Sequence, residues 1–322
     1  TRYHIESNGA KVIDVITEDA HDLYSEHPFK GNMDIEKLAA TLKEYGRDKV
    51  SCIYVELCVN SCGGHPVSLA NLKEVQSLAR AHGVPLFLDG CRILENSYLV
   101  KQREAGYQNL SIPEIVRETC SLADGCTLSA LKDFLVPTGG FIGIRDAKSF
   151  QRAYVQNFFD GTQLAGSAMD AISTALAEIS ASPLYVSSRV EQVNYLWLRL
   201  KGGIPVLCPP AGHAVYIDVK SFLPGLPPER HPAEALAAFV YSISGIRLTK
   251  GPPLAQSQSS RGIELLRLAL PARRYVQGHV DDVAEALFYA HSRRDEIQGL
   301  KRLESPERSK YDPPFFEPVG VR

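Results

Sequence analysis

The sequence predicts an α/β protein with a mostly parallel, doubly wound sheet in a larger domain, followed by a smaller α+β domain. In the first half of the chain, short apolar segments alternate with helical patterns, which is the order expected of βαβ units. In the second half the strand-like segments are short and alternate with helices, without a continuous buried run. We therefore predict a cofactor-binding α/β domain at residues 1–178 and a small α+β domain at residues 179–322.

In the larger domain, β-branched and apolar content predicts strands, and apolar residues at helical spacing predict helices. Asp, Ser and Pro near the expected helix starts are typical capping residues, and glycine favours the ends. The expected strands cover Ala10–Thr17, Val50–Val59, Val84–Leu88, Gly125–Leu128 and Phe141–Ile144. The expected helices cover Asp34–Glu44, Ser68–His82 and 111–123.

The smaller domain is predicted from the same signals. Its expected helices cover Arg189–Lys201, Ala233–Ser244 and His279–His291, and its expected strands cover Ile204–Leu207, Gly212–Asp218 and Leu265–Leu270. The tail from Arg308, with its Pro-Pro and Phe-Phe pairs, is expected to be irregular.

Composition excludes several classes of partner. The net charge of −2 does not favour nucleic acid or an anionic membrane, and no apolar run approaches the length of a membrane span. Seven cysteines, an odd number without a Cys-x-x-Cys pair, favour free thiols in a reducing cytosol over disulfides or a metal site. We therefore expect a cytoplasmic protein.

Polar residues follow three of the predicted strands. Asn60 and Asp89 come after two of them, and Ser129 and Lys132 follow a third. Ligands of such sheets bind beyond the carboxyl ends of the strands. A lysine held there, with its amine partly desolvated and its pKa lowered, is suited to forming a Schiff base. The alternative is a lysine whose amine reaches solvent beside a salt-bridging Asp133.

A lysine and a carboxylate at neighbouring strand ends are what pyridoxal phosphate requires. Lys132 would hold the aldehyde as an imine, and Asp89 would keep the pyridine nitrogen protonated. Asn60 and Arg92 could contact the phenolic oxygen of the ring, and Ser129 offers a hydroxyl to the phosphate.

Three longer runs contain these residues: Asn60-x-x-Gly63-Gly64-x-Pro66-Val67-Ser68-x-Ala70-Asn71, Asp89-x-x-Arg92-x-x-Glu95-Asn96-x-Tyr98 and Ser129-x-x-Lys132-Asp133. Downstream come Ala211-Gly212-His213-Ala214, Arg267-Leu268-x-Leu270-Pro271 and His279-x-Asp281. In this order they resemble the β-eliminating lyases, the family of tryptophanase and tyrosine phenol-lyase.

The resemblance implies the fold of pyridoxal-phosphate-dependent transferases (fold type I) and β-elimination from an amino acid. By the same resemblance Lys132, Asp89 and Arg267 are catalytic, and Arg267 binds the substrate α-carboxylate. His279 and Lys250 are implied near the substrate side chain. The resemblance also implies an oligomer with its active site at a subunit interface, and it leaves room for a monovalent cation as a second cofactor.

The chain departs from the family pattern in ways that affect the expected assembly. The family has a further stretch before the position of Thr1, which carries the main phosphate-binding loop. We therefore expect a two-chain or cleaved enzyme in which a separate chain supplies that part. Leu131 replaces a phosphate-binding lysine, and Lys250 and Thr162 alter the substrate pocket, so the leaving group stays open. The alternatives are a non-catalytic subunit of the same fold and an aminotransferase.

Overall fold

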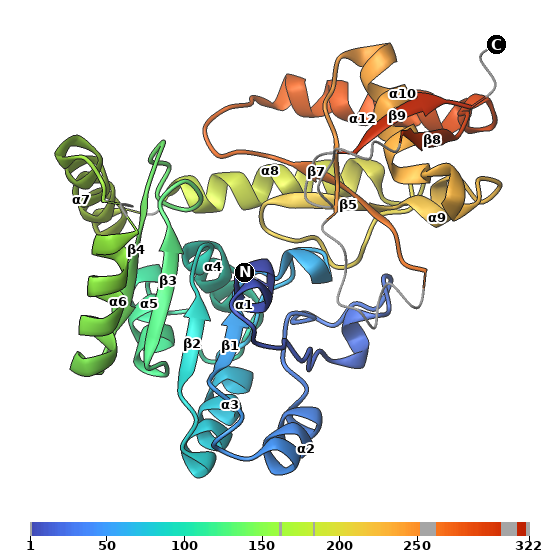
Figure 1. Ribbon diagram of the computed structural model, residues 1–322. Coiled ribbons are helices and arrows are strands. Elements are labelled where there is room, and N and C mark those ends of the chain that lie inside the picture. The colour runs from blue at the N-terminus through green and yellow to red at the C-terminus, as the bar shows by residue number, and fades with distance from the viewer. Residues whose placement is uncertain (1, 161–162, 183, 252–261, 304–313, 320–322) are drawn as a thin grey trace. The chain divides into compact units, whose positions relative to one another are not determined.

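The computed structural model describes the chain except for residues 1, 161–162, 183, 252–261, 304–313 and 320–322 (Figure 1). It forms two compact units. The large unit contains Thr1–Asp22 and His27–Ser188, and the small unit contains Leu23–Glu26 and Arg189–Arg322. Among the described residues, no helix combines the length and the apolar character needed to cross a membrane.

The large unit is built on a four-stranded sheet in the order β1-β2-β3-β4. Strands β1 (Ile53–Glu56), β2 (Leu86–Asp89) and β3 (Gly125–Ser129) are parallel, and β4 (Gly140–Ile144) is antiparallel to β3. The fold prediction of a mostly parallel α/β sheet is therefore confirmed for this unit. The β3–β4 pair is a hairpin whose connection contains Lys132.

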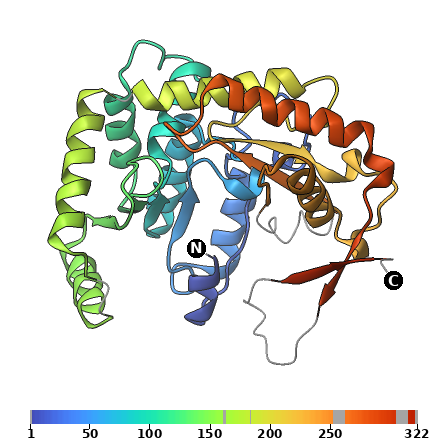
Figure 2. The same ribbon diagram turned by 90° about the horizontal axis from the view of Figure 1, so that it is seen from above.

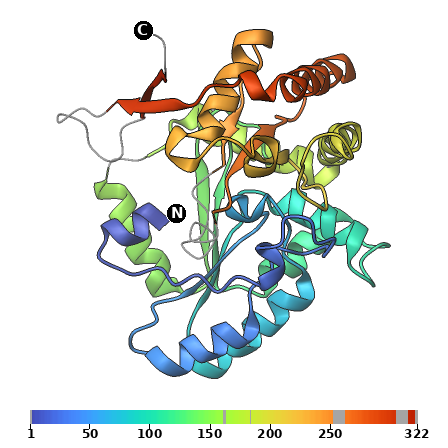
Figure 3. The same ribbon diagram turned by 90° about the vertical axis from the view of Figure 1, so that its right-hand side faces the viewer.

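The helices of the large unit lie on both sides of this sheet. Figures 1 and 3 show α4 and α5 together on one side, whereas α1 lies on the other. The helices are α1 (Arg2–Ser7), α2 (Ile35–Tyr45), α3 (Leu69–His82), α4 (Ile93–Arg103), α5 (Ile112–Ser121), α6 (Ala147–Phe159), α7 (Gly166–Ala181) and the start of α8 (Leu184–Leu200), with 3-10 turns η1 (Glu18–Ala20) and η2 (Asn60–Cys62).

The predicted caps explain where three of these helices begin. The side chains of Asp34 and Ser68 accept hydrogen bonds from backbone N–H groups in the first turns of α2 and α3. Ser111 and Glu114 form a reciprocal capping box at the start of α5. Gly83 ends α3 with a φ of 65°, a left-handed conformation that glycine adopts without a steric penalty.

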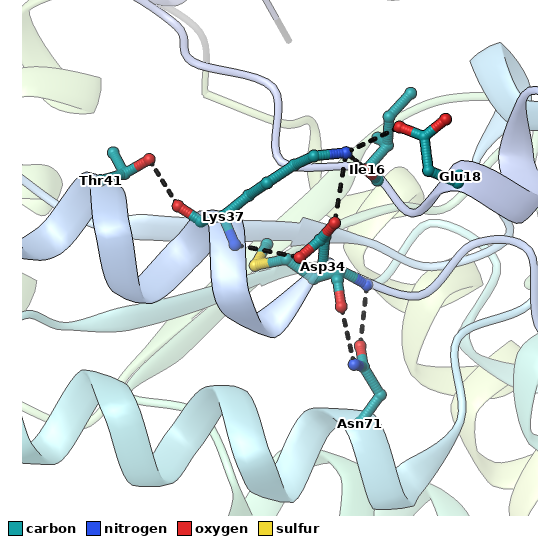
Figure 4. Close-up of polar contacts among 7 residues, drawn as sticks. Ile16, Glu18, Asp34, Lys37, Thr41 and Asn71 are labelled. Atoms are coloured by element: carbon teal, nitrogen blue, oxygen red, sulfur yellow. Dashed lines mark hydrogen bonds and ion pairs between the residues drawn. The ribbon is translucent and has the colours of Figure 1, made fainter.

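The prediction of a strand over Ala10–Thr17 is wrong. Only Ile16 makes an isolated bridge, to Met33. The segment is instead held from its end: Lys37 donates to the Ile16 carbonyl (3.2 Å) and to Glu18 Oε1 (3.0 Å), as Figure 4 shows. β-branched residues favour a strand only when a neighbouring strand pairs with them, and among the described residues none does along this segment.

The two faces of the large sheet differ in burial. In β1 and β2 the residues alternate between fully and partly buried, so Ile53, Val55, Leu86 and Leu88 form the buried face. Their neighbours in the chain project from the opposite face, which we call the open face. It carries Tyr54, Glu56, Phe87, Asp89, Gly125, Thr127 and Ser129.

The small unit has a three-stranded antiparallel sheet in the order β5-β7-β6, formed by β5 (Ala214–Asp218), β7 (Leu265–Ala269) and β6 (Thr249–Lys250). Apolar side chains from α8, α10 (Pro232–Ser244) and α12 (Gln277–Ser292) cover one face of it. Figure 2 shows α8 and α12 side by side, and the hydroxyl of Tyr195 in α8 donates to Asp281 in α12 (2.7 Å).

The remaining elements of the small unit are short. They are α9 (Val219–Phe222), the 3-10 turns η3 (Pro228–Arg230) and η4 (Arg294–Glu296), and the antiparallel pair β8 (Leu300–Leu303) and β9 (Phe315–Pro318). The strand expected over Ile204–Leu207 is reduced to one bridge, between Val206 and Ile217. The tail, expected to be irregular, contains β9, because the Phe-Phe pair lies on a strand paired with β8.

Candidate active site

The carboxyl ends of the three parallel strands bring polar side chains together on the open face. Glu56 lies opposite Asp89 in the β1–β2 register, and Asp89 lies opposite Thr127 in the β2–β3 register. Ser129 is the last residue of β3, two residues beyond Thr127 on the same face. Two carboxyl groups and two hydroxyls therefore share one end of the sheet.

Asp89 is held by the turn that follows it. Its Oδ1 accepts the Cys91 N–H at 3.1 Å, and its backbone carbonyl accepts the Leu57 N–H at 3.0 Å. Burial and the nearby Asp89 raise the pKa of the Cys91 thiol to about 12, so the thiol stays protonated beside the carboxylate. The Ser129 backbone acts in the opposite direction on this pKa, so Cys91 lies near the ends of both β2 and β3.

Arg92 is a buried cation beside this carboxyl group. It is 8% exposed and caps the N-terminus of α4 with its backbone. Its charge lowers the pKa of both Glu56 and Cys91, which places the guanidinium within electrostatic reach of the carboxyl ends of β1 and β2. The sequence-based prediction groups Arg92 with Asp89, and in the structure both charges act on Glu56 and Cys91.

Asn60 lies just past β1, which is shorter than the strand expected over Val50–Val59. Cys58 has a φ of 55°, which turns the chain out of the strand direction. Glu56 Oε1 accepts the Asn60 N–H at 3.3 Å, and Gly64 folds back to donate to the Val59 carbonyl at 2.8 Å. The loop thus holds half-buried Asn60 next to Glu56 at the same end of the sheet.

Lys132 lies in the tight turn that follows β3. Its N–H donates to the Ser129 carbonyl at 3.4 Å, and the Val136 N–H closes the turn on the Ala130 carbonyl at 3.0 Å. The Lys132 side chain is exposed and makes no hydrogen bond or ion pair within the described part of the chain. The described residues therefore do not desolvate the Lys132 amine as expected, and the amine is available to react. Leu131 is 52% exposed in the same turn.

Asp133 does not act as a surface partner of Lys132. It is completely buried, and its Oδ2 accepts the backbone N–H groups of Leu94 (2.7 Å) and Glu95 (3.3 Å). These two amides belong to the first turn of α4, where a negative charge is favourable. The Asp133 carbonyl accepts the hydroxyl of Tyr185. Asp133 therefore joins the lysine turn to the helix that begins just after Asp89 and Arg92.

Glu56 is a site residue that the sequence-based prediction did not identify. Burial raises its pKa, the Asn60 N–H lowers it, the Asp89 charge raises it again and Arg92 lowers it, with a net increase. Its position opposite Asp89 depends on strand register, which the residue pattern alone does not determine. An acidic residue in an otherwise apolar strand was the only sequence signal available.

We expect Glu56→Gln to alter how stability depends on pH. Because the folded chain raises the pKa of Glu56 above its ordinary value of 4.5, the folded state binds the proton more tightly than the unfolded state. The chain should therefore lose stability as pH rises above about 4.5, and the Gln variant should lose less. Thermal unfolding from pH 4 to 8 measures this difference. Exposed Glu74 in α3 provides the control, and a Glu74→Gln curve that matches Glu56→Gln would contradict the assignment.

Arg267 lies in β7 at the centre of the small sheet, opposite Tyr216 of β5 and Thr249 of β6. Leu266 and Leu268, its neighbours in the strand, belong to the core packed under α8, α10 and α12. Strand alternation therefore directs half-buried Arg267 to the other face, which it shares with Tyr216. Its guanidinium is positioned by regular strand pairing.

Lys250 and His279 lie elsewhere in the small unit. The Lys250 amine contacts Glu234 (2.9 and 3.1 Å) and Glu264 (2.9 Å), and these hydrogen bonds raise its pKa despite burial. His279 accepts the Val276 N–H at 3.2 Å in the first turn of α12. It lines a pocket of about 470 Å³ with Leu268 and Leu270. Substrate contact by Lys250 and His279 stays a prediction, and Thr162 lies outside the described residues.

The architecture is that of pyridoxal-phosphate-dependent enzymes of fold type I. A solved structure of serine palmitoyltransferase from Sphingomonas wittichii superimposes with a TM-score of 0.58, at 15% identity, over 82% of this chain and 60% of that one. A structure named as an L-allo-threonine aldolase from Listeria monocytogenes gives 0.51, at 16% identity, over 78% of this chain and 64% of that one. At these identities the likeness defines the fold alone.

Sequence comparison identifies the family within this fold. The family model described as β-eliminating lyase matches residues 1–286. Tyrosine phenol-lyase of Symbiobacterium thermophilum is 40% identical over 333 residues, which cover 99% of this chain and 72% of that protein. The enzyme of the same name from Pasteurella multocida is 40% identical over 331 residues, with the same coverage. The chain belongs to the β-eliminating lyase family, and is a pyridoxal-phosphate-dependent lyase.

The residues at and just beyond the carboxyl ends of the parallel strands fit this cofactor. The Asp89 carboxyl group, held at a strand end, suits a protonated pyridine nitrogen. The buried cation of Arg92 suits an anionic phenolic oxygen. Lys132 presents an amine without a competing partner among the described residues, and the Ser129 hydroxyl lies at the root of the same turn. The monovalent cation stays a prediction.

Proposed function

We propose that this lyase removes a β leaving group from an amino acid and releases pyruvate and ammonia. The observation that supports it most is the 40% identity to tyrosine phenol-lyases across 99% of the chain, with Lys132, Asp89 and Arg267 all present. Tyrosine is the first substrate to test. Because Lys250 pairs with two glutamates, the proposal extends to amino acids with other leaving groups.

Each residue has a defined part in this proposal. The bound pyridoxal ring supplies an electron sink for the bond that breaks at the substrate Cα. Lys132 would hold the cofactor through Nζ and would take the Cα proton of the substrate. Asp89 would keep a proton on the ring nitrogen, and Arg92 and Asn60 would hold the phenolic oxygen. Arg267 binds the α-carboxylate through two parallel N–H donors. Ser129 donates to the phosphate.

The proposal is tested by measuring pyruvate release from L-tyrosine, L-tryptophan, L-serine and S-methyl-L-cysteine in the presence of pyridoxal phosphate. Release from at least one of these, with an equal amount of ammonia, supports β-elimination. Asp89→Ala is the control, since the ring nitrogen then has no carboxylate partner. If cofactor binds to the purified protein and none of the four substrates yields pyruvate, the proposed activity is wrong.

Arg267→Lys is expected to raise KM for the amino acid by about 10- to 100-fold and to change kcat less. The lysine keeps the charge but loses the bidentate geometry, and a charge-assisted hydrogen bond contributes roughly 1.5–3 kcal/mol. Steady-state kinetics give KM and kcat separately. Exposed Arg199 in α8 provides the matched control, since within the described part of the chain Arg199→Lys disturbs only a surface pair with Asp281 (3.6 Å). An unchanged KM in Arg267→Lys would exclude the carboxylate role.

The assembly is a second part of the proposal. We propose that a separate polypeptide completes the phosphate side of the site. That polypeptide would contact the open face of the large sheet and the outer edge of β1. Within the described residues no strand pairs with that edge, and an unpaired edge is a template for another strand. Intact mass spectrometry of the native assembly tests this. A cofactor-loaded complex containing only this chain would exclude the two-chain arrangement.

A non-catalytic subunit is the competing function, and exposed Leu131 favours it, because a leucine there cannot bind phosphate as lysine does. Replacement of Lys132 distinguishes the catalytic function from the non-catalytic one. A regulatory subunit would leave pyruvate release by its partner unchanged when Lys132 is replaced, whereas a catalytic chain would lose it.

A further inference from the structure

A hydrogen bond between two side chains crosses the middle of the three parallel strands on the open face of the large sheet. The hydroxyls of Tyr54 in β1 and Thr127 in β3 lie 2.8 Å apart. Strand β2 runs between β1 and β3, so the contact passes over it. Tyr54 is level with Phe87 of β2, and Thr127 is level with Asp89. The contact therefore crosses β2 between Phe87 and Asp89, and we call it the hydroxyl bridge.

The hydroxyl bridge separates an apolar part of the open face from a polar one. On one side lies Phe87, whose ring covers Gly125 of β3, because a Cβ atom at Gly125 would lie 2.4 Å from a carbon of that ring. On the other side lies the Asp89 carboxyl group, whose Oδ1 accepts the Cys91 N–H at 3.1 Å, just beyond the end of the strand. The two hydroxyls thus lie between an aromatic ring and a carboxyl group.

This arrangement limits where the Asp89 carboxyl group can point. Backbone pairing on both sides of β2 fixes the position of Asp89, and the hydroxyl bridge fills the space on the sheet between Asp89 and Phe87. The carboxyl group is therefore directed away from Phe87 and toward the end of the strand, where the Cys91 N–H holds one of its oxygens. A ligand-binding group is effective when neighbouring side chains hold it in one orientation in this way.

We infer that Tyr54 and Thr127 are positioning residues, which hold the Asp89 carboxyl group in the orientation that binds the ring nitrogen of pyridoxal phosphate. The inference rests on the proposed role of Asp89 and adds two residues to it. Neither of the two needs to touch the cofactor. When the hydroxyl bridge is lost, the space beside Phe87 opens, the carboxyl group gains a second orientation, and its hydrogen bond to the ring nitrogen weakens.

The test compares pyridoxal phosphate with an analogue that has a carbon atom in place of the ring nitrogen. The analogue keeps the aldehyde, the phenolic oxygen and the phosphate, but it forms no hydrogen bond with Asp89. Calorimetric titration of the native assembly, freed of cofactor, gives a dissociation constant for each compound. We expect the unmodified assembly to bind pyridoxal phosphate about 10- to 100-fold more tightly than the analogue, because the hydrogen bond to Asp89 is charge-assisted.

Substitutions at either end of the hydroxyl bridge should reduce this preference for pyridoxal phosphate. Tyr54→Phe and Thr127→Val should each lower it about 3- to 10-fold, the effect of one hydrogen bond, and leave binding of the analogue unchanged. The double variant should be no worse than either single variant, because both remove the same bond. Thr127→Ser keeps the hydroxyl and should keep the preference. Tyr107→Phe is the matched control in the same unit, since it removes a hydroxyl that donates to Glu118 (2.8 Å), and it should behave as the unmodified chain.

The outcomes separate the hydroxyl bridge from the role of Asp89 itself. If the unmodified assembly shows no preference for pyridoxal phosphate over the analogue, Asp89 does not serve the ring nitrogen, and the proposed site and this inference are both wrong. If the preference is present and Tyr54→Phe keeps all of it, the inference alone is overturned. The same conclusion follows if Tyr54→Phe weakens binding of the two compounds equally, because that result indicates a general structural effect.

Discussion

Lys132→Ala is expected to abolish the visible absorbance that pyridoxal phosphate acquires on attachment to a lysine, and to lower kcat/KM by at least about 1,000-fold. In the proposed mechanism the variant loses both the covalent link to the cofactor and the base that takes the Cα proton, and a positioned base alone contributes about 10²–10⁴ in rate. Because the Lys132 side chain is exposed, the substitution should leave the free energy of unfolding unchanged.

The measurement combines an absorbance scan with an assay of pyruvate release. Lys148→Ala is the matched control, because Lys148 is also exposed and lies in α6, away from the turn after β3. The control should keep both the absorbance and the activity. Retention of the absorbance in Lys132→Ala would show that another lysine carries the cofactor, and the proposed site would be wrong.

Asp133→Ala is expected to lower the free energy of unfolding of the large unit by about 2–4 kcal/mol. The substitution removes a fully buried carboxylate. The Leu94 and Glu95 amides in the first turn of α4 then lose the acceptor that Asp133 provides. A buried donor that loses a charged partner costs about 1–3 kcal/mol, and the loss of a negative charge at a helix N-terminus adds to this. Asp133→Asn, which keeps one acceptor oxygen, should be intermediate.

Urea unfolding gives the change in stability, and hydrogen exchange locates it. The amides of Leu94 and Glu95 should exchange faster in Asp133→Ala, whereas those in α2 should change less. Asp48→Ala is the control, because Asp48 is exposed in the turn after α2. Equal stability of Asp133→Ala and Asp48→Ala would mean that Asp133 is not needed to hold the lysine turn against α4.

The sequence was most informative where the interactions are local. The caps at Asp34, Ser68 and Ser111 connect residues three positions apart, so their pattern predicts the starts of α2, α3 and α5. It was least informative for Ala10–Thr17, because a strand requires a partner from elsewhere in the chain. The same limit applies to β1, where a left-handed residue at Cys58 ends the strand earlier than its apolar content suggests.

For the site, the motifs by themselves predict that Lys132, Asp89, Asn60, Arg92 and Ser129 form one group, because each follows the end of a predicted strand and recurs in the order of a known family. Only the tertiary structure decided how these residues are held. Strand register places Glu56 beside Asp89, and Asp133 bonds the lysine turn to the start of α4. Such contacts depend on which segments pack together, so the physical reason is non-local: local preference specifies a turn or a helix end, whereas pairing and burial determine what lies across from it.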